Sequence, residues 1–337
     1  MRETGIMLEI SHQSAQENPL VSVIIPAYNA EDCLTRAVDS ALQQSLSNIE
    51  VIVVDDASSD GTLSVARGLA EKDPRVTVIA QAENGGASAA RNAGIDAAKG
   101  EWVCPLDADD WFSPTRLSTL LDSEQAPLAD LLADDYYLID HESLEPMTTF
   151  AKLNGDTYVE PIQISPSFFV EETNSALAES SDPGYLKPLM RLDFLNKHGI
   201  RYGNNFAVNH DFFIYLDCLI AGGSFLFYPA PHYFYLIAPV SLSRGNNEGK
   251  IDRLRHSIAG VEERLQDERV KADVKLSLAL SEKLTDYKQL FQYHSVANAI
   301  DHNLYVQASL RALKNPSVFR LFLKFFSFHK IRRFLPS

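Results

Sequence analysis

Two aspartates separated by one small residue, Asp107 and Asp109, follow an apolar segment that is typical of a buried strand. In an extended chain, side chains two positions apart project to the same side, so both carboxylates can share one hard divalent cation. Mg²⁺ or Mn²⁺ takes one or two carboxylates and completes its shell with phosphate oxygens. The pair therefore predicts a cation and phosphate site, and the alternative is a solvated acidic turn before the next helix.

A second acidic pair, Asp55 and Asp56, ends another apolar segment. A carboxylate at that position can accept hydrogen bonds from a base imide or a ribose hydroxyl. The alternative for Asp56 is a helix cap or an Asx turn before residues 58–61. A glycine-opened segment, 85–92, predicts a helix start at which Arg91 can contact an anion, with a capped surface helix as the alternative.

The elements that must position these side chains alternate in type. The spacing predicts strands at 21–25, 49–54, 76–80 and 102–106, and helices at 31–43, 60–71 and 86–98. This alternation predicts a Rossmann-like α/β fold with a mostly parallel sheet and helices on both faces. Ligands bind at the carboxyl ends of such strands, where residues 26–29, 55–56 and 107–109 are expected.

The loop after the first strand, Pro26-Ala27-Tyr28-Asn29, contains neither the glycines of a dinucleotide fingerprint nor a Walker lysine. Pro26 is expected to end its strand because proline cannot donate to a sheet. Further along, residues 148–183 indicate a mobile polar loop, 191–198 a helix, and 225–228 and 232–236 two strands. From about residue 247 onward the pattern is helical.

Composition narrows the class of protein. The chain has 337 residues, 45% of them hydrophobic, and a formal net charge of −15, which argues against nucleic acid as a partner. Three scattered cysteines favour a reducing, cytoplasmic compartment. The segment 1–19 is polar and indicates a flexible leader, and we expect no signal peptide or membrane span.

Four motifs together resemble glycosyltransferase family 2: a strand ending P-x-Y-N, a second ending D-D-x-S, an N-x-G-x-x-x-A-R-N helix and a D-x-D-D. The likeness extends through residues 184–202 to Asn209-His210-Asp211, and is greatest to bacterial enzymes that build exopolysaccharides such as succinoglycan. It implies a GT-A catalytic domain at 20–245, with a nucleotide-binding half at 20–112 and an acceptor-binding half at 113–245. A helical C-terminal region would follow at 246–337.

The resemblance also implies roles for single residues. It assigns nucleotide binding to the residues Pro26, Tyr28, Asn29, Asp55, Asp56, Arg91 and Asp107. Asp107 and Asp109 would hold Mn²⁺ or Mg²⁺, and Asp211 would be the base that deprotonates the acceptor. Many relatives have Glu-Asp where this chain has His210-Asp211, so His210 has no assigned role, and a helix-capping aspartate beside a packed histidine is the alternative. His232 and Arg244 are candidates for contact with the diphosphate or acceptor. The alternatives are structural packing for His232 and a solvated charge for Arg244.

The implied activity is inverting transfer of a sugar, with glucose as the candidate, from a UDP-sugar to a lipid-linked or oligosaccharide acceptor. A nucleotidyltransferase of similar fold and a non-catalytic scaffold that binds sugar nucleotides are the alternatives. The last 27 residues carry seven Lys or Arg and no acidic residue, and 316–334 predicts a basic amphipathic helix. This tail predicts peripheral contact with the cytoplasmic face of the inner membrane, or docking on the protein itself or a second copy.

Overall fold

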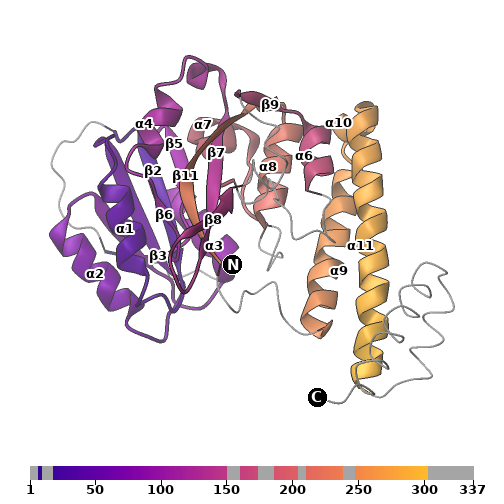
Figure 1. The fold of residues 1–337 in the computed structure, drawn as a ribbon, viewed down its shortest axis with the longest axis horizontal. Coiled ribbons are helices and arrows are strands. Elements are labelled where there is room, and N and C mark those ends of the chain that lie inside the picture. The colour runs from indigo at the N-terminus through magenta and orange to yellow at the C-terminus, as the bar shows by residue number, and fades with distance from the viewer. Residues whose placement is uncertain are drawn as a thin grey trace. The chain divides into compact units, whose positions relative to one another are not determined.

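A mixed sheet built around four parallel apolar strands forms the centre of the N-terminal part of the chain (Figure 1). The computed structural model describes residues 7–9, 18–149, 160–173, 186–203, 210–237 and 247–302. Within them, the strands are β1 (Met7–Glu9), β2 (Val21–Ala27), β3 (Ile49–Asp55), β4 (Val76–Ala80), β5 (Trp102–Pro105), β6 (Trp111–Phe112), β7 (Leu131–Asp140), β8 (Pro146–Thr149), β9 (Ile162–Ile164), β10 (Leu189–Arg191) and β11 (Phe225–Ile237). Their order along the sheet is β1-β4-β3-β2-β5-β10-β7-β11-β6, with β8 on β7 and β9 on β11.

The helices that follow the first three parallel strands cover both faces of the sheet. Helices of this part are α1 (Leu34–Leu42), α2 (Thr62–Lys72), α3 (Gly86–Ala97), α4 (Arg116–Leu121), the 3-10 turn η1 (Ala126–Leu128), α6 (Pro166–Glu172), α7 (Leu192–His198) and α8 (His210–Ile220). The chain advances from β2 to β4 in one direction and then returns to β5 beside β2. Because such crossovers are right-handed, α3 lies on the face opposite α1 and α2. The predicted α/β class is confirmed.

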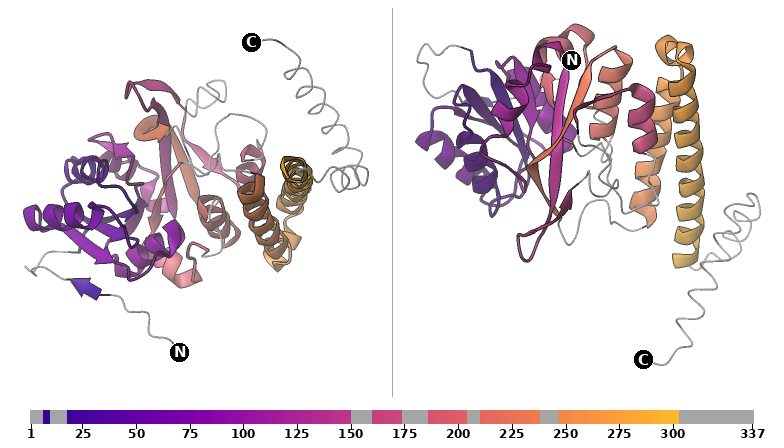
Figure 2. Two further views of the ribbon diagram at one scale, coloured as in Figure 1. Left: turned by 90° about the horizontal axis from the view of Figure 1, so that it is seen from below. Right: turned by 45° about the horizontal axis from the view of Figure 1, so that its top comes forward.

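The reversal of strand order between β2 and β5 creates the crevice in which open α/β sheets bind ligands. Helix α3 approaches β2 closely there, since a Cβ added at Gly94 would overlap Ile24 Cγ2. On the other side of β5, the short strand β10 runs antiparallel to β5 and to β7. The long strands β7 and β11 lie side by side in parallel (Figures 1 and 2).

Several predicted boundaries differ from those in the structure. Strand β2 continues past Pro26, which pairs with Val54 of β3. The nitrogen of Pro26 faces β5, and the pairing of β2 with β5 already ends at Ile24, so proline interrupts no strand pairing there. The two strands predicted at 225–228 and 232–236 form one strand, β11, with irregular register where Pro231 interrupts the ladder. The predicted loop at 148–183 contains β9 and α6, and three residues of the predicted leader form β1 against β4.

The chain divides into two compact units, residues 1–239 and 240–337. The described part of the second unit is helical as predicted, with α9 (Asn247–Arg264), α10 (Glu268–Ala272) and α11 (Val274–Asp301). Among the described residues, no helix combines the length and apolar character that crossing a membrane requires. The predicted tail at 316–334 lies outside the described residues.

Candidate active site

Asp107 lies just beyond the end of β5, beside the point where the strand order reverses. Its carboxylate accepts a hydrogen bond from the Arg91 guanidinium, and its Oδ2 is 2.9 Å from Lys187 Nζ. Burial by itself would raise the pKa of the Asp107 carboxyl, but the charges of Lys187 and Arg91 outweigh it and hold the pKa well below its usual range. Asp107 is therefore ionised and paired with two cations.

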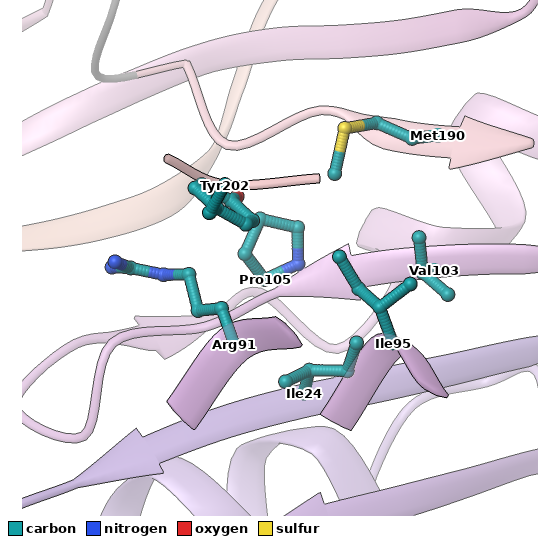
Figure 3. A pocket seen from close by; sticks show the side chains of 7 residues that line it. All are labelled: Ile24, Arg91, Ile95, Val103, Pro105, Met190 and Tyr202. Carbon is teal, nitrogen blue, oxygen red and sulfur yellow. The ribbon is translucent and has the colours of Figure 1, made fainter. Parts of the chain in front are cut away.

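Arg91 projects from the buried side of α3 toward this carboxylate. Figure 3 shows its guanidinium pointing away from the apolar side chains of Ile95 and Val103, which line a small cavity with Arg91. The guanidinium carbon lies 5.4 Å from the centre of the Tyr202 ring, and Nη1 is 2.6 Å from His210 Nε2. Arg91 thus joins the end of β5 to the start of α8.

Lys187 reaches the same place because of strand pairing. It immediately precedes Pro188 and β10, and β10 runs antiparallel to β5, so the start of β10 lies beside the end of β5. The ammonium is buried and bridges two carboxylates, with Nζ 2.6 Å from Asp211 Oδ2 as well as 2.9 Å from Asp107 Oδ2. Sequence reasoning gave Lys187 no role.

Asp211 lies in the first turn of α8, where a negative charge is favoured by the helix dipole. Burial by itself would raise the pKa of its carboxyl, but Lys187 and Arg91 lower it below the ordinary value. Within the described residues, its Oδ1 atom is buried without a hydrogen-bond partner. The carboxylate is therefore ionised, with Oδ2 in an ion pair and Oδ1 buried without a partner among the described residues.

His210 is a neutral imidazole in this setting. Burial lowers its pKa, as do the charges of Arg91 and Lys187 against the opposing charge of Asp211, and the resulting value is about 4. Because Nε2 faces the Arg91 donor, Nε2 accepts and Nδ1 carries the proton. The neutral imidazole adds no charge of its own beside the Arg91–Asp107 ion pair.

A second group of predicted residues lies at the ends of β2 and β3. The Asp56 carboxylate accepts 2.8 Å hydrogen bonds from the backbone N–H groups of Gly85 and Gly86, and so caps α3. Asp60 forms an Asx turn of its own, in which its Oδ1 accepts hydrogen bonds from the N–H and hydroxyl of Thr62. Asp56 therefore orients the helix that carries Arg91.

The loop after β2 is tied to the loop after β3. Asn29, with a left-handed φ of 50°, accepts hydrogen bonds from the Ser59 N–H and hydroxyl through its side-chain oxygen. The Tyr28 ring is 53% exposed beside them, and Pro26 lies within β2. Asp55 Oδ2 accepts from the Ser58 N–H at 3.3 Å. These contacts leave the Tyr28 face open to a flat ligand.

The acidic turn that follows β5 contains the two carboxylates expected to hold a divalent cation, Asp107 and Asp109. Burial and the nearby Asp107 charge raise the pKa of the Asp109 carboxyl, and Asp109 forms no ion pair with any described residue. A carboxylate that lies beside another negative charge and has no ion-pair partner is a suitable ligand for a hard cation. Asp107 is already paired with two cations, and the described residues contain no group of three or more His, Cys, Asp or Glu placed to hold a metal. These residues therefore fit a cation that takes one carboxylate ligand from the protein, Asp109, and its other ligands from phosphate and water.

The next residue, Asp110, has a structural role, which the sequence did not reveal: it binds the acidic turn to β11. The Tyr233 hydroxyl donates to Asp110 Oδ2 at 2.6 Å and accepts from the Asp107 N–H at 3.3 Å. The Leu236 N–H also donates to Asp110, at 2.8 Å. These bonds fix the acidic turn against β11.

The predicted residue His232 lies outside the cluster of Arg91 and Asp211. His232 Nδ1 lies 2.9 Å from the Ala230 carbonyl oxygen and 3.6 Å from Asp134 Oδ2, on the β7 side of the sheet. Arg244 lies outside the described residues. The signal for the missed Lys187 was a single lysine inside the apolar segment Leu186–Met190, since a buried lysine requires partners.

Comparisons with known proteins agree with this architecture. A family model described as glycosyl transferase family 2 matches residues 22–177. The chain is 30% identical over 314 residues to the succinoglycan biosynthesis protein ExoO of Rhizobium meliloti, covering 90% of this chain and 86% of that protein. ExoU of the same organism is 30% identical over 319 residues, covering 94% of this chain and 90% of the relative.

Solved structures share the fold at lower identity. S. aureus TarS 1–349 in complex with UDP-GlcNAc superposes with a TM-score of 0.54 at 15% identity, covering 82% of this chain and 91% of that one. The mannosyltransferase PcManGT of Pyrobaculum calidifontis, in complex with GDP-Man and Mn²⁺, gives 0.52 at 20% identity, with 92% and 85% covered. The fold is therefore that of a GT-A glycosyltransferase. Together with the two Rhizobium relatives, this shows that the chain belongs to glycosyltransferase family 2.

Proposed function

We propose that this glycosyltransferase moves one sugar from a UDP-sugar, with glucose as the candidate, to a lipid-linked or oligosaccharide acceptor in bacterial exopolysaccharide synthesis, with inversion at the anomeric carbon. The relatives named for succinoglycan biosynthesis support the polysaccharide product. The TarS complex with UDP-GlcNAc supports a UDP-linked donor. The observation that carries the proposal is the ionised, buried Asp211 carboxylate, whose Oδ1 has no hydrogen-bond partner in the part of the chain that the structure describes.

In this mechanism, the donor diphosphate lies at the crevice between β2 and β5. The exposed Tyr28 ring would stack on the uracil, and the Asp56 and Asp107 carboxylates would accept hydrogen bonds from the base or ribose. Asp109 would hold Mg²⁺ or Mn²⁺, which on binding neutralises the charge that develops on the leaving diphosphate. Arg91, which pairs with Asp107 and lies beside the neutral His210, would add positive charge on the protein side.

Asp211 supplies the acceptor side. Its ionised carboxylate takes the proton of the acceptor hydroxyl as that oxygen attacks the anomeric carbon opposite the leaving diphosphate. A single displacement of this kind inverts the configuration, so an α-linked donor gives a β-linked product. Proton NMR of the product reads the outcome, and a retained configuration would contradict the proposal.

The experiment compares Asp211→Asn with the wild type. Loss of a positioned base costs about 10²–10⁴ in rate, so we expect turnover to fall in that range while UDP affinity by calorimetry stays within about threefold. The donor is found by thermal shift with UDP-glucose, UDP-galactose, UDP-GlcNAc and GDP-mannose, each with and without Mn²⁺. Asp109→Asn should remove the Mn²⁺-dependent part of the stabilisation. An unchanged rate in Asp211→Asn would refute the assigned base.

We further propose that the enzyme works in the cytoplasm, peripherally on the inner membrane, through residues 316–334. Its seven nearby basic residues and aromatic side chains support binding to an anionic lipid surface. Deletion of residues 317–337 should abolish cosedimentation with phosphatidylglycerol vesicles. Unchanged vesicle binding would refute the membrane role.

A further inference from the structure

Lys187 is a buried lysine to which the mechanism above gives no part. Its side chain is 2% exposed, and it lies between Leu186 and Pro188 at the start of β10. A buried ammonium is unfavourable unless it is paired, so its partners indicate why it is there.

Its partners come from the two sides of the proposed reaction. Nζ lies 2.9 Å from Oδ2 of Asp107, on the donor side, and 2.6 Å from Oδ2 of Asp211, the proposed base. One ammonium therefore holds the end of β5 and the first turn of α8 at a fixed separation.

The backbone that carries this ammonium is itself fixed. Lys187 has a left-handed φ of 47°, a conformation that a long side chain seldom adopts unless its surroundings impose it. Its carbonyl oxygen accepts a 2.8 Å hydrogen bond from Arg116, which is fully buried and pairs through two nitrogens with Asp134. The lysine thus projects from a rigid base.

The consequence for Asp211 concerns its two oxygens. Lys187 occupies Oδ2, while Oδ1 is buried and has no partner among the described residues. A carboxylate free to rotate would present either oxygen, and misplacing a catalytic group by about 1 Å can cost about 10² in rate.

Building on the proposed function, we propose that Lys187 is a positioning residue that holds Asp211 by Oδ2 and so directs Oδ1 to the acceptor hydroxyl. The proton moves from that hydroxyl to Oδ1, the acceptor oxygen bonds to the anomeric carbon, and the nucleoside diphosphate leaves with the electron pair of the broken bond. Lys187 stays protonated throughout and touches neither reactant.

The test measures UDP release from UDP-glucose, or from whichever donor of the thermal-shift panel turns over fastest. Lys187→Met should lower kcat about 10²-fold, the size expected for a misplaced base. A change in donor KM is attributed to Asp107, so kcat is the diagnostic quantity. Lys187→Arg keeps a cation between the carboxylates and should be at least about tenfold faster than Lys187→Met.

A double variant separates positioning from a general structural effect. If Lys187 acts through Asp211, then Lys187→Met lowers the residual kcat of Asp211→Asn by less than about threefold, because residues that act as a unit are not additive. The matched control is Lys283→Met, which removes an equally buried ammonium from α11 and should leave kcat within about threefold. Thermal unfolding of each variant checks that it is folded. If Lys187→Met does not fold, Lys187→Arg takes its place in the test. Any loss of kcat that Lys187→Arg causes in the wild type must then disappear when it is combined with Asp211→Asn.

The proposal is overturned if folded Lys187→Met keeps the kcat of the wild type. It is also overturned if Lys187→Met lowers kcat by the same factor in the Asp211→Asn background as in the wild-type background. A wild type that releases no nucleotide from any donor would instead defeat the proposed function, and this inference with it.

Discussion

His210 should give the protein a measurable loss of stability in mild acid. A histidine has a pKa of about 6.5 in an unfolded chain, and the folded protein lowers the pKa of His210 to about 4. The folded state therefore favours the neutral imidazole. This contribution is fully present above pH 6.5 and is lost as the pH falls toward 4, because the unfolded state then binds a proton that the folded state refuses.

The two pKa values set the size of the effect. Their difference corresponds to about 3 kcal/mol of unfolding free energy at the acid limit, and about 2 kcal/mol of it is lost between pH 8 and pH 5. His210→Gln provides the comparison, since its amide oxygen can accept from Arg91 and does not titrate. The carboxylates of the cluster, whose pKa values are lowered, stay ionised over this range in both proteins.

Urea unfolding followed by tryptophan fluorescence measures the difference. Both tryptophans, Trp102 and Trp111, belong to the first unit together with His210, so the signal reports the relevant unit. We expect the wild type to lose about 2 kcal/mol more than His210→Gln between pH 8 and pH 5. Equal losses in the two proteins, or an NMR titration of His210 with a midpoint near 6.5, would show that the imidazole is not held neutral.

Three further predictions concern packing and capping, each read by urea unfolding at pH 8. Gly94→Ala should cost about 1–3 kcal/mol because its methyl group would overlap a β2 side chain, whereas Gly68→Ala, which meets no atom within 4 Å, should stabilise α2 by about 0.5–1 kcal/mol. Arg116→Met should cost about 3–5 kcal/mol by leaving a buried carboxylate unpaired, against less than about 1 kcal/mol for Arg75→Met in a partly exposed pair. Asp56→Ala should cost about 1 kcal/mol by uncapping α3 and should also weaken UDP binding by calorimetry.

The parallel half of the sheet could be predicted from the sequence because its signals are local. Apolar runs such as Val76–Ala80, followed by helical spacing, fix both the type and the order of those elements. The polar ends of the strands then identify one edge, and Arg91, Asp107 and Asp211 do lie together there with His210.

The other half of the sheet depends on partners far away in the chain. Strand β10 has three residues, and β7 includes the buried Asp134, which only becomes tolerable in a strand through its pairing with Arg116. No short-range pattern reveals such a pairing. The same holds for Lys187, whose place follows from the antiparallel alignment of β10 with β5, and for His232, which faces Asp134 rather than the Asp211 cluster.

The bonds from Tyr233 to Asp110 and to the Asp107 N–H have a consequence for engineering this enzyme. They join the turn after β5 to a strand, β11, that also pairs with β9. A chimera in which residues 113–245 come from a relative, made to change acceptor choice, would therefore replace Tyr233. The acidic turn after β5 would lose the hydrogen bonds that hold it against β11. Such grafts should succeed only when the incoming strand brings a tyrosine in register with Asp110.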